Sequence, residues 1–252
     1  MSKSICIIGA LKDEVAAIKG QMLIEDSVRL GSTHALKGSW HGQPLILLRS
    51  GMGKHRARDA LFQAQDRFPL SIVISIGFAG GVRPGLREGD LVFADTVFDS
   101  CAASENLPSR QPLPALDKTL VDRAMMLCPN IQSHRGGLLT VDKAVCKPEE
   151  KRALGNRYPI LAVDMETAGL LPVAMENHLP FLSVRAVTDT VDQELVNFSS
   201  YVDETGEVSK LKAGWHILTH PATIPKIRDL RDHCRTATFN LTYFVAEFLR
   251  LA

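Results

Sequence analysis

Two acidic side chains stand at the ends of predicted strands. Glu166 follows the apolar run at 160–163 and opens a helical stretch, and Asp189 follows the next apolar run at 180–187. Strand, helix and strand in this order are typical of a parallel sheet, in which ligands bind at the carboxyl ends of the strands. Two carboxyl groups there could hold a sugar and protonate a leaving group, which is the chemistry that releases a base from a nucleoside.

Each of the two acids also has a structural interpretation. Glu166 could be a first-turn acid that interacts with the helix dipole, and by spacing alone this is the commoner case. Asp189 could cap a loop or a helix after its strand, and its position favours neither interpretation.

The composition indicates one globular domain over residues 1–252. The chain has 252 residues, of which 45% are hydrophobic, and it contains no linker, internal repeat or low-complexity tract. A chain of this size buries a large core. Its 29 basic and 28 acidic residues give a net charge of +1, so no attraction to nucleic acid is expected.

Cysteine usage and hydropathy favour a cytoplasmic location. Five cysteines, widely spaced and without a CxxC motif, are expected to be reduced thiols: Cys6, Cys101, Cys128, Cys146 and Cys234. The first apolar run, at 5–11, meets charged residues at once and is expected to be a core strand, not a signal peptide. The longest apolar stretch, at 70–82, is too short to span a bilayer.

Hydrophobic periodicity predicts an α/β protein of three layers, with a central mixed, mostly parallel sheet. Strands are predicted at 5–10, 27–30, 34–40, 44–49, 72–76, 90–98, 136–141, 160–163 and 180–187. Helices are predicted after Glu14 and at 54–66, 116–127, 148–154, 165–177 and 211–251, the last broken at Pro221 and Pro225. Residues 104–114 are expected to form a mobile surface loop near the site.

Five short motifs, each weak alone, follow one another in an order that forms a strong signal. They are Ile8-Gly9-Ala10 with Glu14, Ser50-Gly51-Met52-Gly53-Lys54, Ile76-Gly77-Phe78-Ala79-Gly80-Gly81 with Gly89-Asp90, Val163-Asp164-Met165-Glu166, and Arg185-Ala186-Val187-Thr188-Asp189. With them the chain resembles, over nearly its whole length, the superfamily of purine nucleoside phosphorylases and methylthioadenosine nucleosidases. Residues 137–142 and the tail around His220-Pro221 are most similar to its hopanoid-associated branch.

The resemblance implies an enzyme that cleaves the N-glycosidic bond of a 5′-substituted adenosine, with adenosylhopane as the expected substrate and hydrolysis as the expected reaction. Asp189 would donate a proton to purine N7, and burial would favour its protonated form. Glu14 would position or deprotonate the attacking water. Glu166 would accept hydrogen bonds from the ribose hydroxyls and stabilise the cationic sugar.

Further residues are expected around the ribose and the base. Met165 would pack its thioether against the sugar, and Arg185 would orient Glu166 or a neighbouring acid; their structural interpretations are a core methionine and an ion pair. The base pocket is expected to be lined by Ala79, Gly80, Ala144, Val145 and Asp164. Two residues depart from the nucleosidase pattern: Phe78 replaces a small polar residue, and Ala144 replaces an aromatic residue that stacks on adenine. Base specificity is therefore less defined than the reaction type.

Phosphate-dependent cleavage, giving a sugar 1-phosphate, is an alternative reaction. Arg49, Gly53 and Lys54 cluster at a Gly-x-Gly turn that could cradle an anion, although the run 54–58 also has the pattern of a solvated helix face. Ser75 stands where hexameric phosphorylases have an arginine, which favours water as the nucleophile. Two further functions are compatible with the sequence: hydrolysis of methylthioadenosine or adenosylhomocysteine, and binding of a nucleoside or a lipid by a catalytically silent protein.

No metal or organic cofactor is expected. His216 and His220 are four residues apart, but the residues between them lack the glutamate of a zinc protease motif and no third ligand is apparent. The glycine motifs match neither a Walker loop nor a dinucleotide fingerprint. The expected partner is a small-molecule nucleoside, lipid-linked in the hopanoid case, and the resemblance implies a homo-oligomer.

The C-terminal tail has two interpretations. Basic residues at 226–235 are followed by aromatic and apolar residues at 239–249. This arrangement fits peripheral contact with a membrane surface, where a lipid-linked substrate would reside. A terminal helix that covers the sheet or a subunit interface is the more common case, because amphipathic helices usually face a core.

Overall fold

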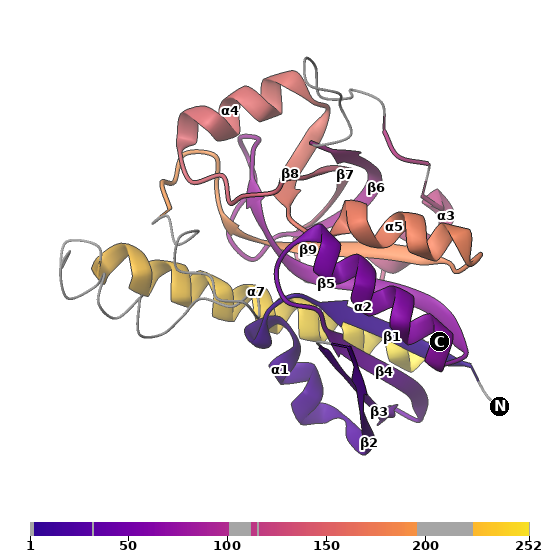
Figure 1. The fold of residues 1–252 in the computed structure, drawn as a ribbon. Helices are drawn as coiled ribbons and strands as arrows, with labels where there is room; N and C mark the ends of the chain where they lie inside the picture. Colours follow the sequence, from indigo (N-terminus) through magenta and orange to yellow (C-terminus); the bar gives the residue numbers. More distant parts are fainter. Residues whose placement is uncertain (1–2, 32, 101–111, 115, 196–223, 252) are drawn as a thin grey trace.

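A computed structural model describes residues 3–31, 33–100, 112–114, 116–195 and 224–251, and these residues form one nine-stranded mixed sheet between helices (Figure 1). The strands are β1 Ser4–Gly9, β2 Leu23–Leu30, β3 Thr33–Trp40, β4 Gln43–Arg49, β5 Leu70–Gly81, β6 Leu91–Asp99, β7 Ser133–Thr140, β8 Ile160–Asp164 and β9 Phe181–Asp189. Their order in the sheet is β2-β3-β4-β1-β5-β8-β7-β6-β9, and β5 also pairs with β9. The last five strands of that order therefore form a closed circuit.

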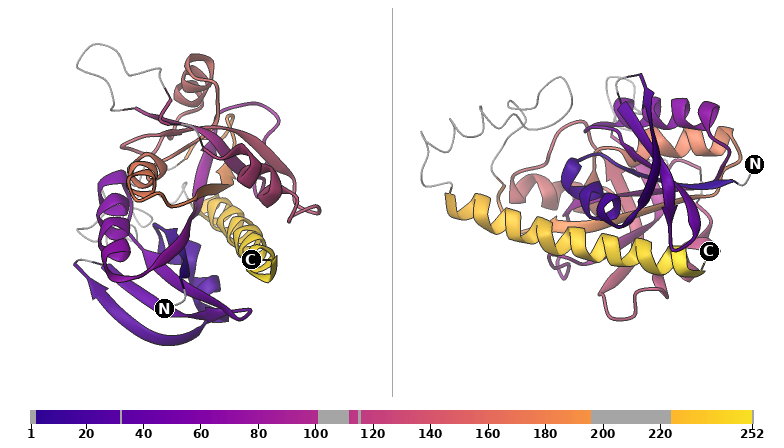
Figure 2. Two further views of the ribbon diagram at one scale, coloured as in Figure 1. Left: turned by 90° about the vertical axis from the view of Figure 1, so that its right-hand side faces the viewer. Right: turned by 90° about the horizontal axis from the view of Figure 1, so that it is seen from below.

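Helices cover both faces of the sheet, which confirms the predicted α/β class with a central mixed sheet (Figure 2). They are α1 Lys12–Gln21, α2 Lys54–Arg67, α3 Lys118–Met125, α4 Pro148–Arg157, α5 Thr167–Glu176 and α7 Ile224–Leu251. Buried side chains of α2 and α5 belong to one hydrophobic cluster, and those of α1, α3 and α7 belong to another. The helices α1, α2, α3 and α7 each bury one apolar stripe, as the 3.6-residue period requires, whereas α5 is buried on nearly all sides.

Strand β5 differs from its prediction and thereby shapes the site. The apolar pattern predicts its end at residue 76, but the strand continues through the glycines to Gly81. It pairs in parallel with β1 as far as Ser75 and with β9 as far as Gly80, and its last two residues pair antiparallel with β8, where Gly80 faces Val163. The strands β8 and β9 are therefore not hydrogen-bonded neighbours, because the end of β5 lies between them.

The tail forms one long helix, α7, that packs against the sheet. Pro225 is its second residue and does not break it, because proline is tolerated in the first turn of a helix. Leu241, Phe244 and Leu249 are fully buried, whereas Phe239 is exposed. The apolar face of the tail therefore covers the sheet, and Leu241, Phe244 and Leu249 pack there; peripheral membrane contact of the tail stays a prediction.

Several predictions of the sequence fall outside the described residues. They concern His216, His220, Pro221, Cys101 and most of the loop at 104–114. The cysteines that the structure does describe, Cys6, Cys128, Cys146 and Cys234, are free thiols. No helix in the described part of the chain is both long enough and apolar enough to cross a membrane.

Candidate active site

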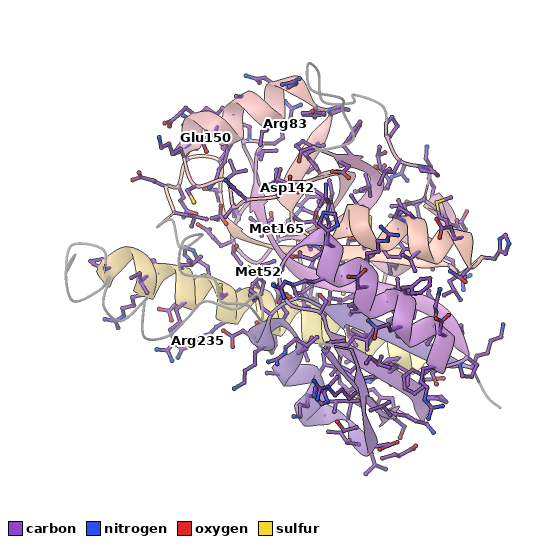
Figure 3. The ribbon with its side chains drawn as sticks, viewed as in Figure 1. Met52, Arg83, Asp142, Glu150, Met165 and Arg235 are labelled. Carbon is purple, nitrogen blue, oxygen red and sulfur yellow. The ribbon has the colours of Figure 1, made fainter. Side chains whose placement is uncertain are left out.

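A cavity of about 170 Å³ lies where β1, β5, β8 and β9 end. Three acids far apart in the sequence, Glu14, Glu166 and Asp189, all line it. Its other walls are mostly apolar: Ala10, Leu11, Met52, Phe78, Ala79, Gly80, Val141, Ala144, Val145, Val163, Met165 and Leu195, together with Asp164 and Thr188. Met52 and Met165 lie near the centre of the molecule in Figure 3. The structure thus brings together the three predicted acids, Met165, and the residues expected around the base.

Glu14 is held by the backbone of two strand ends. One oxygen, Oε2, accepts N–H bonds from Ala10 at 2.7 Å and Leu11 at 2.8 Å, and Oε1 accepts the N–H of Phe78 at 2.9 Å. Burial raises the pKa of this carboxyl group, although the three N–H donors and the charge of Arg185 act in the opposite direction. A carboxylate offers about four acceptor sites, so roughly one remains for a water molecule in the cavity.

Glu166 reaches across to another loop and does not cap its own helix. It occupies the position before α5, where its side chain makes no capping hydrogen bond. Its Oε1 instead accepts the N–H of Gly53 at 2.9 Å. Burial raises the pKa of Glu166 to about 8, and the charges of Asp164 and Glu14 act in the same direction. The Glu166 side chain therefore joins two loops by a hydrogen bond and does not cap α5.

Asp189 ends β9 beside a buried lysine. The Nζ atom of Lys151, on α4, lies 2.5 Å from Asp189 Oδ2, and neither side chain is more than 4% exposed. Thr188 donates its hydroxyl to Asp189 Oδ1 at 2.9 Å. Burial raises the pKa of Asp189, while Lys151 and Thr188 lower it. The carboxyl group is thus both desolvated and beside a cation.

Arg185 lies behind the cavity and not in its wall. Its guanidinium group pairs with Asp164, with Nη2 at 2.8 Å and Nε at 2.9 Å from Oδ2. Nη2 also donates to Ser75 and Thr167, both at 2.9 Å. Because Arg185 is 1% exposed and fully engaged, it supports Asp164 instead of contacting a ribose. The prediction that groups Arg185 with the residues around the ribose is corrected, because Arg185 does not line the cavity; it orients a neighbouring acid, Asp164, through an ion pair.

Two glycines of β5 leave room for two of the acids. A Cβ atom built on Gly77 would lie 3.0 Å from Glu14 Oε1, and one built on Gly80 would lie 3.0 Å from Asp189 Oδ2. Contacts this short would require the carboxyl groups to move. The glycines of this motif therefore have a physical role, since they let two strand ends bring carboxyl groups close to the backbone of β5.

The residues expected to bind phosphate do not gather at this cavity. Arg49 lines a separate hollow of about 470 Å³ with Lys12 and Lys19 of α1. Lys54 pairs with Asp99 at 2.8 Å and with Asp142 at 3.4 Å. Gly53 is the exception, because its N–H binds Glu166. Among the described residues that line the acidic cavity, none is a lysine or an arginine.

The acids of the site would stabilise a cationic ligand or transition state in their ionised form. Asp164 and Asp189 have buried cations beside them, in Arg185 and Lys151, whereas Glu14 and Glu166 contact mainly backbone N–H groups. Negative charge that is fixed in advance stabilises positive charge that develops during a reaction. In the part of the chain that the structure describes, no three His, Cys, Asp or Glu side chains are grouped to hold a metal ion.

Lys151 is a residue of the site that sequence reasoning missed. It stands in a run of charged residues, Glu149-Glu150-Lys151-Arg152, that has the pattern of a solvated helix face. Its neighbours in this run are exposed, but Lys151 is fully buried. The position of Lys151 one helical turn from Leu154 and Gly155, which also face inward, is the signal that could have indicated burial.

The fold and the acidic cavity define an α/β enzyme of the nucleoside-cleaving type, and comparison with known proteins identifies its family. Residues 4–213 match the family model of the phosphorylase superfamily, and the chain belongs to this superfamily. The match confirms the expectation of an enzyme, either a nucleosidase or a nucleoside phosphorylase.

Curated relatives include several 5′-methylthioadenosine/S-adenosylhomocysteine nucleosidases. The one from Tolumonas auensis is 31% identical over 209 residues, which cover 78% of this chain and 91% of the relative. The one from Aeromonas salmonicida is 32% identical over 215 residues, or 81% of this chain and 94% of the relative.

Solved structures share the fold. The methylthioadenosine/adenosylhomocysteine nucleosidase of Neisseria meningitidis, in complex with methylthio-immucillin-A, superposes with a TM-score of 0.77 at 22% identity, covering 100% of both chains. A futalosine hydrolase of Helicobacter pylori superposes with a TM-score of 0.72 at 20% identity, covering 98% of this chain and 100% of that one. At these identities the likeness concerns the fold alone.

Proposed function

We propose that the protein hydrolyses the N-glycosidic bond of a 5′-substituted adenosine and releases adenine. The observation that carries the proposal is the convergence of Glu14, Glu166 and Asp189 on one cavity. The names of the curated relatives, which are nucleosidases for such substrates, support it.

The reaction assigns one step to each acid. Asp189 gives its proton to N7 of the purine, so that the bond between C1′ and N9 breaks and its electron pair leaves with the base. Glu166 accepts hydrogen bonds from the ribose hydroxyls. Positive charge that develops on the sugar favours the ionised form of Glu166, which in turn stabilises the cationic sugar. Glu14 takes a proton from the water whose oxygen bonds to C1′. Exchange with solvent returns a proton to Asp189 and removes one from Glu14.

Water is favoured over phosphate as the nucleophile because of the cavity wall. Phosphate needs cationic or amide donors. The wall has no lysine or arginine among the described residues, and the N–H groups of Ala10, Leu11 and Phe78 are already bound to Glu14.

The 5′ substituent has two candidates. A hopanoid substituent, as in adenosylhopane, is supported by the likeness of residues 137–142 and of the tail to the hopanoid-associated branch. A thioether, as in methylthioadenosine, is supported by the names of the curated relatives and by a cavity of about 170 Å³, which is small for a polycyclic lipid. Phe78 and Ala144 line the cavity and depart from the nucleosidase pattern, but they bear on the water and the base and select neither candidate.

The test measures adenine release from adenosylhopane and from methylthioadenosine, each with and without phosphate. We expect equal rates in both buffers, free ribosyl product, and a higher kcat/KM for adenosylhopane. A higher kcat/KM for methylthioadenosine would select the thioether candidate, and a sugar 1-phosphate formed only with phosphate would exclude hydrolysis.

The variant Asp189→Asn tests the assignment of the acid. We expect a loss of roughly 100-fold or more in kcat, which is the size of general acid catalysis. The matched control is Asp192→Asn, three residues further on, because the Asp192 side chain is 72% exposed and pairs with Arg152 at the surface. Unchanged adenine release by Asp189→Asn would exclude Asp189 as the acid.

A further inference from the structure

Lys151 is buried in a way that its neighbours on α4 are not. Its side chain is 0% exposed, whereas the side chain of Arg152, the next residue, is 54% exposed. Burying an ammonium group is costly unless the group is paired and hydrogen-bonded. The partners of Lys151 should therefore explain why it is inside the protein.

The partners of Lys151 belong to the segment that carries Asp189. Its Nζ lies 2.5 Å from Asp189 Oδ2 and donates hydrogen bonds to the carbonyl oxygens of Thr190 at 2.9 Å and Gln193 at 2.8 Å. An ammonium group has three N–H donors, and the two carbonyl oxygens accept two of them, while the contact with Asp189 Oδ2 is an ion pair. Lys151 thus binds both the proposed acid and the turn that follows it.

We propose that Lys151 is a positioning residue for Asp189, which holds the carboxyl group toward the purine and keeps its proton transferable. The proposal rests on the proposed function, because it gives Lys151 a role only through the acid. Lys151 itself does not line the cavity, and it has no direct contact with the substrate in this proposal.

The electrostatic reason is the balance at Asp189. Burial alone raises the pKa of the Asp189 carboxyl group, and Lys151 is the largest influence that lowers it. An acid with too high a pKa binds its proton too strongly to transfer it, and catalysis is best when the pKa lies near the working pH. Lys151 offsets part of the effect of burial, so that the carboxyl group stays buried and can still transfer its proton.

Other charged or titratable groups also face Asp189. His233 of α7 lowers its pKa, and its Nδ1 lies 3.1 Å from the carbonyl oxygen of Thr188. The thiols of Cys146 and Cys234 are near enough for Asp189 to raise their pKa. An imidazole can change charge between roughly pH 5 and 8, so its contribution needs a variant of its own.

A purely structural role for Lys151 is the competing explanation. The two carbonyl contacts could simply hold the turn at 190–193, in which case the loss of Lys151 would weaken the fold and the activity without acting through Asp189. A double-mutant cycle separates the two roles, because coupling appears only when two residues act together.

The experiment compares Lys151→Met, Asp189→Asn and the double variant, with Arg152→Met as the matched control. Arg152 is also a cation of α4 that pairs with the turn after Asp189, but at the surface. For each, kcat and KM for adenine release are measured from pH 5 to pH 10, with a thermal melt. His233→Gln measures the contribution of the imidazole to the profile.

We expect Lys151→Met to lower kcat about 10- to 100-fold at pH 7 with little change in KM. The basic limb of its kcat profile should move up by about one pH unit, because loss of a neighbouring cation raises the pKa of an acid. In the Asp189→Asn background, Lys151→Met should lower the residual rate no further. Arg152→Met should leave the profile unchanged. Lys151→Arg, which keeps the positive charge, should return the limb toward its original position even if kcat stays low.

Two results would overturn the proposal: a basic limb that stays in place in Lys151→Met, or a further loss of the same size in the Asp189→Asn background. If Lys151→Met does not fold, the kcat profile of Lys151→Arg decides. A basic limb that moves up in Lys151→Arg by the full pH unit expected for Lys151→Met contradicts the proposal. Failure of the proposed function is distinguished by full activity of Asp189→Asn, whatever Lys151 does.

Discussion

Two cation–carboxylate pairs are buried among the described residues, and they differ in how many other hydrogen bonds their partners make. In the pair of Arg185 and Asp164, the carboxylate also accepts hydrogen bonds from Thr140 and Thr167, and the guanidinium also binds Ser75. In the pair of Lys151 and Asp189, the carboxylate lines the cavity and has Thr188 as its other side-chain partner. The first pair is structural, and the second leaves its acid available to a ligand.

The difference shows that a buried ion pair is not by itself a sign of catalysis. Both pairs are almost completely excluded from solvent. Asp164 and Asp189 both line the cavity, so only the number of other hydrogen bonds that the carboxyl group accepts distinguishes the structural pair from the proposed catalytic acid. The following experiments change one side of this comparison at a time.

Loss of the structural pair of Arg185 and Asp164 should have the largest effect on stability. We expect Arg185→Met to lower the free energy of unfolding by about 3–5 kcal/mol, because Asp164 would remain buried without its cation. Urea denaturation measures this change. Arg152→Met, which removes an exposed pair, should change it by no more than about 1 kcal/mol. If both variants have the same free energy of unfolding, the pair of Arg185 and Asp164 does not stabilise the fold.

Loss of the proposed base should chiefly affect the rate. We expect Glu14→Gln to lower kcat by about 10²- to 10⁴-fold, the size of general base catalysis. Its amide would also place a donor against the N–H groups of Ala10, Leu11 or Phe78, at a cost in stability of about 1–3 kcal/mol. Asp13→Asn, an exposed neighbour, is the control for adenine release and for melting. A normal kcat in a folded Glu14→Gln variant would exclude the assigned base.

Glu166, whose hydrogen bond comes from a backbone N–H and not from a cation, should make stability depend on pH. Burial raises its pKa to about 8, so between its unfolded value and pH 8 the folded state binds more protons than the unfolded state. Stability due to this group is complete at low pH and is lost as the pH rises toward 8, by at most about 1.4 kcal/mol per pH unit.

The variant Glu166→Gln should therefore flatten the decline of stability between pH 5 and pH 8. Denaturation at several pH values measures the slope, and Glu176→Gln, at the exposed end of the same helix, is the control. An identical slope in wild type and Glu166→Gln would show that Glu166 is already ionised at low pH.

The smallest effect should come from the glycine that clears space for Asp189. The methyl group of Gly80→Ala would lie 3.0 Å from Asp189 Oδ2 and should displace the carboxyl group by a few tenths of an ångström. We expect a kcat about 10-fold lower, since misplacement of about 1 Å costs about 100-fold. Gly20→Ala, where the methyl group would meet nothing within 4 Å, should leave kcat unchanged. Equal rates for both variants would mean that the position of Asp189 is not critical.

Much of the fold could be predicted from the sequence because its signals are local. The apolar run in β5, and the order of strands and helices around α2 and α5, can be predicted from residues that are neighbours in the sequence. The continuation of β5 through Gly81 could not be predicted, because glycines usually end strands and here they are kept by pairing with β9 and β8.

The acids of the site could be predicted from motifs, but their supports could not. Glu14, Glu166 and Asp189 stand beside strand ends, where function concentrates. Lys151 lies in a charged run of a helix, and its burial depends on a turn about 40 residues away in the chain. The sequence favours Arg49 as a phosphate ligand because Arg49 adjoins the Gly-x-Gly turn. Side chains alternate between the two faces of a strand, however, and the side chain of Arg49 lies on the face of β4 that α1 covers.

The most direct test of the central claim is a crystal structure with methylthio-immucillin-A, the transition-state inhibitor seen in related folds. We predict that a carboxyl oxygen of Asp189 lies within hydrogen-bond distance of the base nitrogen equivalent to N7, and that Glu166 binds the hydroxyl groups of the sugar ring, with Glu14 nearest to the nucleophile position. An inhibitor bound elsewhere, or with its base turned away from Asp189, would contradict the account.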